Sequence, residues 1–202
     1  TLMLELLWND SINTNQDIYI DSAEAANYTG SIIVRELGLT DLTGIEAFTS
    51  FTYLDCSKNE LTELNISECA GLTKLDCYYN NISELDLSNN IALETLHIAY
   101  NPVTRLDVSQ NTNLATLLCY GNNLEHLDLR NGNNTDIATF SAVLNPSLCI
   151  SVDNTAWSNV NWNDYKDATA SFMNDCTVGI QEKETIIGIE SIYDIYGRKV
   201  IK

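Results

Sequence analysis

An internal repeat with a constant period of 21 residues runs through the middle of the chain. Four consecutive segments align without a gap: 51–71, 72–92, 93–113 and 114–134. In every segment leucine occupies the fourth and fourteenth positions and asparagine the ninth. The preceding residues fit with an offset of 22, because Ile32, Val34, Leu39 and Leu42 fall opposite Leu54, Cys56, Leu61 and Leu64. Such a repeat predicts a solenoid of five coils, in which each coil buries its apolar side against its neighbours.

The residues within one repeat predict a short strand followed by a turn. The segment LTKLDCYYNNISELDLSNNIA (72–92) alternates apolar and polar residues around Leu75, as a strand with one buried face does. Asn80, at the ninth position, can hydrogen-bond the backbone of the turn. The pattern L-x-x-L-x-C/I-x-x-N-x-L-x-x-L-D-V/L-S resembles the leucine-rich repeat, in the 21 to 22-residue form of bacterial surface proteins. The resemblance covers residues 32–134 and implies an α/β fold, a right-handed leucine-rich-repeat solenoid with a parallel β-sheet.

Four parts follow from this pattern. We expect a helical N-terminal cap in 1–30, leucine-rich repeats in 31–134, an irregular C-terminal cap in 135–178 and a tail in 179–202. The C-terminal cap loses the 21-residue spacing, and its aromatic residues cover the last coil: Trp157, Trp162, Tyr165 and Phe172. The tail is similar to the opening of a C-terminal sorting segment of exported proteins of Gram-negative bacteria. A loosely docked tail with no sorting role is the alternative.

The six cysteines fall into two main groups. The inward-pointing sixth position of the coils holds Cys56, Cys77, Ile98 and Cys119, and we expect these cysteines to be buried free thiols. Cys149 and Cys176 lie in the C-terminal cap, where a disulfide would close the cap of an exported protein. Their spacing alone leaves the bonded and the free states open.

The loop in residues 13–24 resembles the calcium-binding loop of an EF-hand. The candidate ligands, at loop positions one, three, five, seven, nine and twelve, are Asn13, Asn15, Asp17, Tyr19, Asp21 and Glu24. Two departures disfavour the ion, because Asn13 replaces the usual first Asp and Ile18 replaces the usual Gly. We predict a helical cap that binds no ion, with weak calcium binding as the alternative and no other cofactor.

The charge balance limits the partners. The chain has 28 acidic and 10 basic side chains, a net charge of −18, whereas binding to nucleic acid depends on Lys and Arg. We therefore expect no nucleic-acid partner. We also expect no membrane span, because no run of 18 apolar residues is present. The N-terminal residues lack the pattern of a signal peptide, so we expect a secreted or cell-surface monomer from which the signal has been removed.

The residue patterns do not predict an enzyme. His97 is at the fifth position of its coil and His126 at the thirteenth, so the two side chains face different sides of the solenoid. The sequence has no glycine-rich phosphate loop after a strand and no nucleophile-elbow motif. One acidic column does recur at the fifteenth position, in Asp86, Asp107 and Asp128, with Asn65 completing it. We expect these side chains to cap the backbone of a repeated turn, rather than to act in catalysis or hold cations.

The outward positions of the strands predict a binding surface. Side chains at positions three, five, seven and eight alternate with or follow the inward anchors, and this grid includes Asp55, Ser57 and Ala99. Its candidate ligand-binding residues are Tyr53, Asp76, Tyr78, Tyr79, His97, Tyr100 and Tyr120. Stacked tyrosines suit a protein or glycan ligand, but they also stabilise neighbouring strands. We therefore predict an exported or cell-surface adhesion module that binds through its concave sheet; the alternative is a structural spacer with no ligand.

Overall fold

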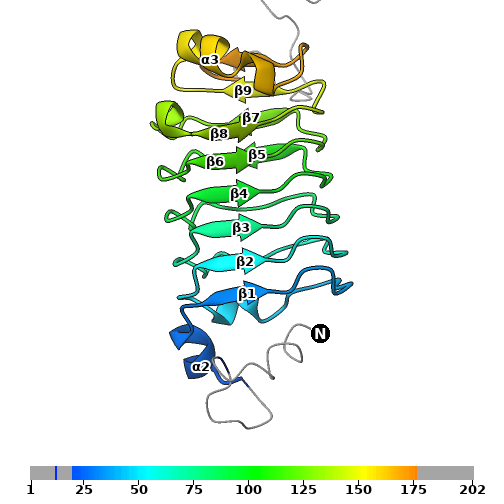
Figure 1. Ribbon diagram of the computed structural model, residues 1–202, viewed down its shortest axis with the longest axis vertical. Coiled ribbons are helices and arrows are strands. Elements are labelled where there is room, and N and C mark those ends of the chain that lie inside the picture. The colour runs from blue at the N-terminus through cyan, green and yellow to red at the C-terminus, as the bar shows by residue number, and fades with distance from the viewer. Residues whose placement is uncertain (1–11, 13–19, 177–202) are drawn as a thin grey trace, which may run out of the picture.

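The structure is a computed structural model that describes residue 12 and residues 20–176. In this part of the chain the coils stack into an elongated solenoid, with helix α2 (Ser22–Asn27) at one end and helix α3 (Thr155–Asn161) at the other (Figure 1). Each described strand is three residues long. None of the described helices is long and apolar enough to cross a membrane.

The first sheet contains one strand from each coil. In spatial order its six parallel strands are β1 (Ser31–Ile33), β2 (Tyr53–Asp55), β3 (Lys74–Asp76), β4 (Thr95–His97), β6 (Thr116–Leu118) and β8 (Thr139–Ser141). Leu54 pairs with Leu75 and Leu75 with Leu96, so the strand register follows the 21-residue period. Ile32 pairs with Leu54, as the offset of 22 predicts. The predicted solenoid with a parallel sheet is confirmed.

A second parallel sheet forms later in each of the last coils. Its spatial order is β10 (Ser171–Met173), β9 (Cys149–Ser151), β7 (His126–Asp128) and β5 (Arg105–Asp107). The inward residues of these strands include Leu106 and Leu127, which join the same core as the leucines of the first sheet. Because both sheets point their leucines into one core, they lie on different sides of the solenoid. The sequence prediction placed only turns here, because it assigned the aspartates at the fifteenth position to backbone capping.

A ladder of buried asparagines joins each coil to the next. Its members are the ninth-position residues Asn59, Asn80, Asn101 and Asn122, together with Asn145. The amide of Asn80, for example, donates to the carbonyls of Cys77 and of Cys56 in the preceding coil, at 3.0 and 3.1 Å. Its Oδ1 accepts from the backbone N–H of Leu61 at 3.1 Å. An asparagine is required because it supplies two donors and an acceptor on one short side chain.

Helix α2 and the short 3₁₀ helix η1 (Ile45–Ala47) lie at the N-terminal end. Asp21 caps helix α2 by accepting from the backbone N–H of Ala23 and Glu24, at 2.8 and 2.9 Å. Behind the helix, Phe48 and Phe51 are fully buried, with their rings edge to face. These aromatic side chains close the apolar end of the first coil.

The solenoid continues beyond residue 134, where the sequence analysis ended the repeats. Phe140 pairs with Leu117 and Ile150 pairs with Leu127, an offset of 23 residues in both cases. Asn145 occupies the ladder position of this additional coil. The coil escaped sequence detection because two extra residues, next to the short helix η2 (Asn134–Asp136), shift it out of the 21-residue period.

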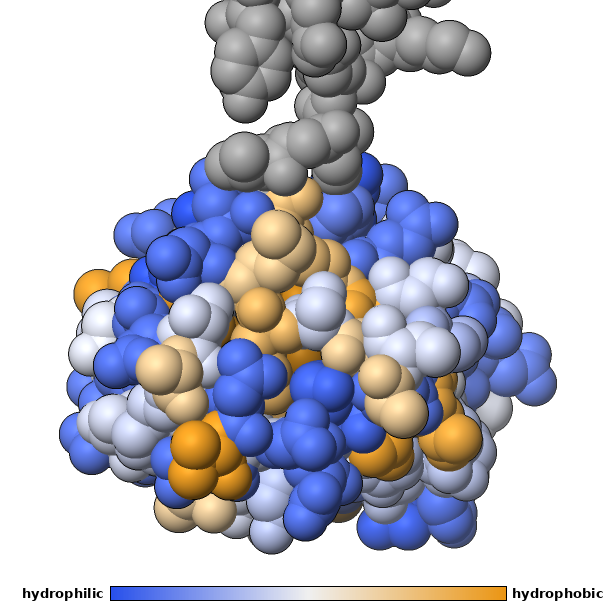
Figure 2. Space-filling view, turned by 90° about the horizontal axis from the view of Figure 1, so that it is seen from above, coloured by the Kyte–Doolittle hydropathy of each residue, from blue (hydrophilic) through white to orange (hydrophobic). Residues whose placement is uncertain are grey.

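Helix α3, the 3₁₀ helix η3 (Asn163–Tyr165) and β10 cover the last coil. Trp162 and Phe172 are buried there as predicted, but Tyr165 is 51% exposed, so its predicted role in the core is wrong. A disulfide joins Cys149 to Cys176. Viewed from this end, some hydrophobic side chains are visible in the middle of the surface and others near its rim, with hydrophilic side chains between them (Figure 2).

Candidate functional site

The structure brings the seven predicted ligand-binding residues together on the outer side of the first sheet. We call this set the tyrosine patch: Tyr53, Asp76, Tyr78, Tyr79, His97, Tyr100 and Tyr120. Contacts run through the set without a break, from the Tyr53 hydroxyl to Asp76 and from there to His97. The rings then continue from His97 through Tyr120 to Tyr100. Four successive coils therefore contribute to one surface.

Two stacked ring pairs form the centre of the tyrosine patch. Tyr78 stacks on His97 with ring centroids 4.3 Å apart and an interplanar angle of 21°. Tyr79 stacks on Tyr100 at 4.4 Å and 12°. The Tyr78, Tyr79 and Tyr100 hydroxyls make no hydrogen bond to any described residue. The stacks thus occupy ring faces and leave hydroxyl groups available to a ligand.

The eighth position of each coil has a left-handed backbone. Positive φ angles recur in Glu36, Lys58, Tyr79, Tyr100, Gly121 and Leu144, at 59°, 55°, 53°, 56°, 67° and 61°. This conformation costs a non-glycine residue about 1–2 kcal/mol. Gly121 continues the Tyr79 and Tyr100 column without a side chain, and a Cβ there would lie 2.7 Å from the Tyr100 ring. The ring of Tyr100 therefore depends on glycine in the next coil.

Two carboxylates lie almost buried beneath the tyrosines. Asp76 is 9% exposed, and its Oδ2 accepts from the Tyr53 hydroxyl at 2.7 Å and lies 3.1 Å from the Lys74 ammonium. Asp55 is 7% exposed and accepts from the backbone N–H of Ser57 at 3.0 Å. The sequence analysis placed Asp55 and Ser57 on the outward grid. Asp55 does lie beside the patch, since the Tyr53 hydroxyl is 3.5 Å from its Oδ2. Both residues are buried, however, and the Ser57 hydroxyl donates to Asp55 Oδ1, so neither offers an exposed group to a ligand.

Ala99 is a further correction to the outward grid. It lies at the seventh position, between Tyr78 and Tyr120 of the neighbouring coils, and it is fully buried. A methyl group is too short to reach past the larger side chains around it. The exposed surface around Ala99 is therefore formed by the aromatic side chains of the neighbouring coils.

Burial favours the neutral form of His97. Its half-buried ring has a lowered pKa because burial disfavours the imidazolium, although the nearby carboxylate of Asp76 acts in the opposite direction. The Nδ1 atom lies 3.8 Å from Asp76 Oδ1, and the Tyr120 hydroxyl lies 3.4 Å from Nε2. Burial also raises the pKa of Tyr120. The centre of the patch thus combines uncharged rings with polar groups.

Cationic side chains lie over the ring faces at one edge of the patch. The Lys74 ammonium is 4.2 Å from the Tyr53 ring centroid, and the Arg35 guanidinium is 5.5 Å from that of Tyr78. The sequence analysis missed Arg35. The offset of 22 puts Arg35 at the seventh position, opposite Ser57 of the next coil. Because the Ser57 side chain is small, Arg35 can reach past it to Tyr78, one coil further on. The alignment of the repeats could therefore have identified Arg35 as a neighbour of the patch.

The structure describes two of the six candidate ligands of the EF-hand-like loop. Asp21 and Glu24 form a capping box for helix α2, in which Glu24 Oε2 accepts from the backbone N–H of Asp21 at 3.1 Å. Asn13, Asn15, Asp17 and Tyr19 lie outside the described residues. Among residue 12 and residues 20–176, no group of three or more His, Cys, Asp or Glu side chains is arranged to hold a metal. Calcium binding by this loop stays a prediction.

The fifteenth-position aspartates and the sixth-position cysteines, which were not assigned to binding, have structural roles. Asp86 and Asp107 accept from the backbone N–H of Ser88 and Ser109, at 2.9 and 2.8 Å, as the capping hypothesis predicts. The sixth-position cysteines and Cys69 are fully buried free thiols. Burial raises the pKa of Cys69 and Cys119 to about 12. These thiols act as core side chains.

Comparisons with known proteins find similar solved structures. No family model and no curated protein matches the sequence. The functional domain of InlJ from Listeria monocytogenes, whose structure includes a cysteine ladder, is 26% identical with a TM-score of 0.62, over 75% of this chain and 36% of that one. An internalin (inlF) from L. monocytogenes str. 4b F2365 is 17% identical with a TM-score of 0.59, over 84% of this chain and 55% of that one. The chain thus spans well under two thirds of either protein.

Proposed function

The chain is a leucine-rich-repeat solenoid of the bacterial type, and we propose that it is a binding module of a secreted or cell-surface protein, which holds a protein partner on its tyrosine patch. The observation that carries this proposal is the unbroken set of contacts among five rings on the outer side of the first sheet, to which Asp76 joins Tyr53, so that four coils contribute. Tyrosine is enriched at the energetic centres of protein interfaces. The likeness to the InlJ domain supports a surface role.

The position of two tyrosines favours binding over strand decoration. Tyrosines within strands stabilise neighbouring strands through cross-strand contacts. Tyr79 and Tyr100, however, lie after β3 and β4 have ended. The left-handed backbone there recurs in every coil and does not itself require an aromatic side chain. Strand stabilisation therefore does not explain this pair, and Tyr79 is 49% exposed.

Ring geometry favours a protein over a glycan. A sugar ring packs on an open aromatic face, but each ring of the two stacked pairs already covers one face of the other. The hydroxyl groups and ring edges that stay available suit the mixed polar and apolar contacts of a protein interface. Lys74 adds a charged group at the edge of the patch, which favours specificity.

Paired arrays of purified extracellular proteins and of glycans test the proposal. The probes are the wild-type chain, the patch variant Tyr79→Ser with Tyr100→Ser, and the control Val160→Ser, which changes an exposed residue on α3. We expect the wild type and the control to capture the same proteins and the patch variant to lose them. Capture that is equal for all three probes, or no capture by the wild type, contradicts the proposal. Patch-dependent capture of glycans alone contradicts the protein assignment.

A further inference from the structure

Basic side chains gather at the N-terminal end of the tyrosine patch. The described part of the chain has six of them: Arg35, Lys58, Lys74, Arg105, Arg130 and Lys166. The first three lie in three successive coils beside the patch, where Lys74 and Arg35 lie over tyrosine rings. In a chain with a net charge of −18, half of the described basic side chains therefore lie at one end of one surface.

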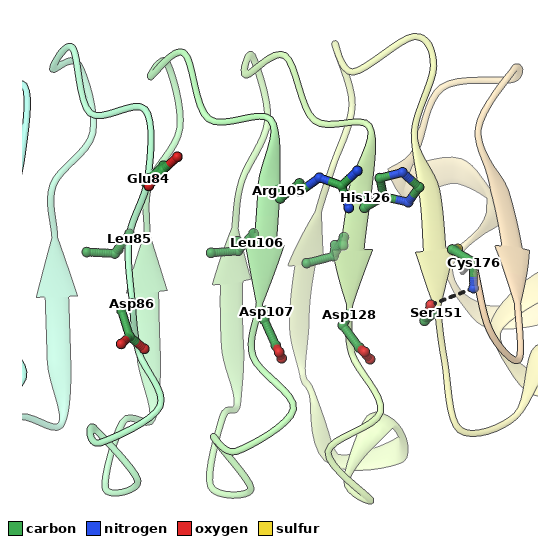
Figure 3. A pocket seen from close by; sticks show the side chains of 11 residues that line it. Glu84, Leu85, Asp86, Arg105, Leu106, Asp107, His126, Asp128, Ser151 and Cys176 are labelled. Carbon is green, nitrogen blue, oxygen red and sulfur yellow. Dashed lines mark hydrogen bonds between the residues drawn. The ribbon is translucent and has the colours of Figure 1, made fainter. Parts of the chain in front are cut away.

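The outward face of the second sheet, in contrast, is acidic. It carries Asp86, Asp107 and Asp128 in one row and Glu84, Arg105 and His126 in another (Figure 3). Carboxylates outnumber the single guanidinium in this set. An acidic partner is therefore repelled by this face, whereas the N-terminal end of the patch offers it positive charge.

Arg35 is exposed, and its hydrogen-bond donors are free. Its guanidinium lies 5.5 Å from the ring centroid of Tyr78, which in turn stacks on His97. The Arg35 Nε atom is 3.7 Å from the carboxylate of Glu36, too far for a hydrogen bond, and Glu36 also binds the Lys58 ammonium. Arg35 donates no side-chain hydrogen bond to any described residue. The N–H groups of a guanidinium beside an aromatic ring are thus available to a ligand.

The carboxylates of the patch are already satisfied. Asp76 accepts from the Tyr53 hydroxyl and lies 3.1 Å from the Lys74 ammonium. Asp55 is 7% exposed and caps its own turn. Neither carboxylate pairs with Arg35. An incoming anion therefore does not have to displace them.

We propose that the tyrosine patch binds an acidic segment of its partner protein, and that Arg35 holds an Asp or Glu carboxylate of that segment. This inference rests on the proposed function, because it names the chemistry of the partner that the patch binds. A guanidinium presents its donors in a planar fork that matches the two oxygens of a carboxylate. The Tyr78 and Tyr79 hydroxyls, which bond to no described residue, are further donors. A basic segment fits poorly, because Arg35 and Lys58 would repel it.

Three short peptides test this inference by NMR titration of the purified chain. The probe is acetyl-Ala-Glu-Ala-amide, and its neutral and basic controls are acetyl-Ala-Gln-Ala-amide and acetyl-Ala-Lys-Ala-amide. Salt at about 0.15 M screens the net charge of the chain beyond about 8 Å, so local contacts decide the binding. The backbone amide signal of Tyr78 reports the patch, and that of Arg105 reports the second sheet. We expect the acidic peptide to shift the Tyr78 signal with a dissociation constant about fivefold or more below that of either control, and to leave the Arg105 signal in place.

Matched variants locate the effect. Arg35→Gln removes the charge and the fork and should abolish the preference for the acidic peptide, while Arg35→Lys keeps the charge without the fork and should reduce it. Arg105→Gln removes an exposed guanidinium outside the patch and should leave the preference unchanged. Equal affinity for the acidic and neutral peptides, tighter binding of the basic peptide, binding of none, or a preference that survives Arg35→Gln overturns the inference.

These outcomes are distinguishable from those of the protein array. Patch-dependent capture on the array together with equal affinity for the peptides upholds the proposed function and overturns the acidic partner. A peptide preference that depends on Arg35, without capture on the array, supports the carboxylate site and contradicts the proposed function.

Discussion

At the residue scale, the left-handed backbone of the eighth position places Gly121 next to Tyr100 in the column at the edge of the first sheet. Gly121 and Gly38 both have positive φ angles, of 67° and 65°. They differ in their surroundings, because a Cβ at Gly121 meets the Tyr100 ring whereas a Cβ at Gly38 meets nothing within 4 Å. Substitutions at the two glycines therefore separate the cost of backbone strain from the cost of displacing the Tyr100 ring.

Gly38→Ala should lower the free energy of unfolding by about 1 kcal/mol, through the strain of a side chain at positive φ. Gly121→Ala should cost more, because the added methyl group also displaces the Tyr100 ring. In a Tyr100→Ala background this extra cost of Gly121→Ala should disappear. Urea denaturation of the wild type, the three single variants and the double variant measures each free energy of unfolding. Equal costs at the two glycines would show that Tyr100 does not lie over Gly121.

The buried thiols predict how stability depends on alkaline pH. Because burial raises the pKa of Cys119 to about 12, the folded thiol stays protonated where the unfolded thiol, near pH 9, ionises. The free energy of unfolding should therefore fall as the pH rises above 9, by at most about 1.4 kcal/mol per pH unit for each thiol. Denaturant titrations between pH 8 and 10.5 should show a shallower fall for Cys119→Ala. Parallel curves for the two proteins would contradict this account.

At the element scale, sequence reasoning predicted the strands that recur with the 21-residue period and missed the elements that depart from it. Leucine and asparagine recur at fixed positions, so the strands of the first sheet and their register could be read from the period. The coil around Phe140 was missed because its offset is 23 residues. The second sheet was missed because only the later coils form it, so it is not a property of every repeat. The members of the tyrosine patch followed from alternation, but the burial of Asp55 depends on a local hydrogen bond that alternation does not encode.

The asparagine ladder gives an element-scale prediction. Asn80→Ala should lower the free energy of unfolding by about 2–3 kcal/mol, since it leaves the buried backbone N–H of Leu61 without its acceptor. Cys56 O accepts from both Asn59 and Asn80, so removal of both amides should cost more than the sum of the single changes. The control Asn113→Ala removes an exposed hydrogen bond and should cost less than about 1 kcal/mol. Similar losses for Asn80→Ala and Asn113→Ala would contradict the role of the ladder.

The C-terminal cap gives a second prediction at this scale. The disulfide joins residues separated by 27 positions, and its loss should cost about 3–4 kcal/mol through the entropy of the unfolded chain. Reduction should therefore lower the denaturation midpoint, which the fluorescence of Trp157 and Trp162 reports. An unchanged midpoint after complete reduction would show that the cap does not depend on the bond.

At the scale of the whole molecule, the solenoid has two surfaces of different chemistry on one core. The tyrosine patch on the first sheet presents uncharged rings above buried carboxylates, while the outward face of the second sheet carries the acidic column and Arg105. Sequence reasoning found the patch because its residues are chemically unusual. It also predicted the role of the acidic column, since Asp86 and Asp107 accept hydrogen bonds from the backbone of their turns.

The affinity for a protein partner captured on the array tests the central claim, that the tyrosine patch is a binding surface. Biolayer interferometry should compare the wild type, Tyr79→Ser with Tyr100→Ser, and the control Val160→Ser. Two interface residues that each contribute about 1–2 kcal/mol predict that the patch variant binds about 30-fold to 1000-fold more weakly, with the control unchanged. A patch variant that unfolds at the same denaturant concentration as the wild type and binds within about threefold of its affinity would contradict the account.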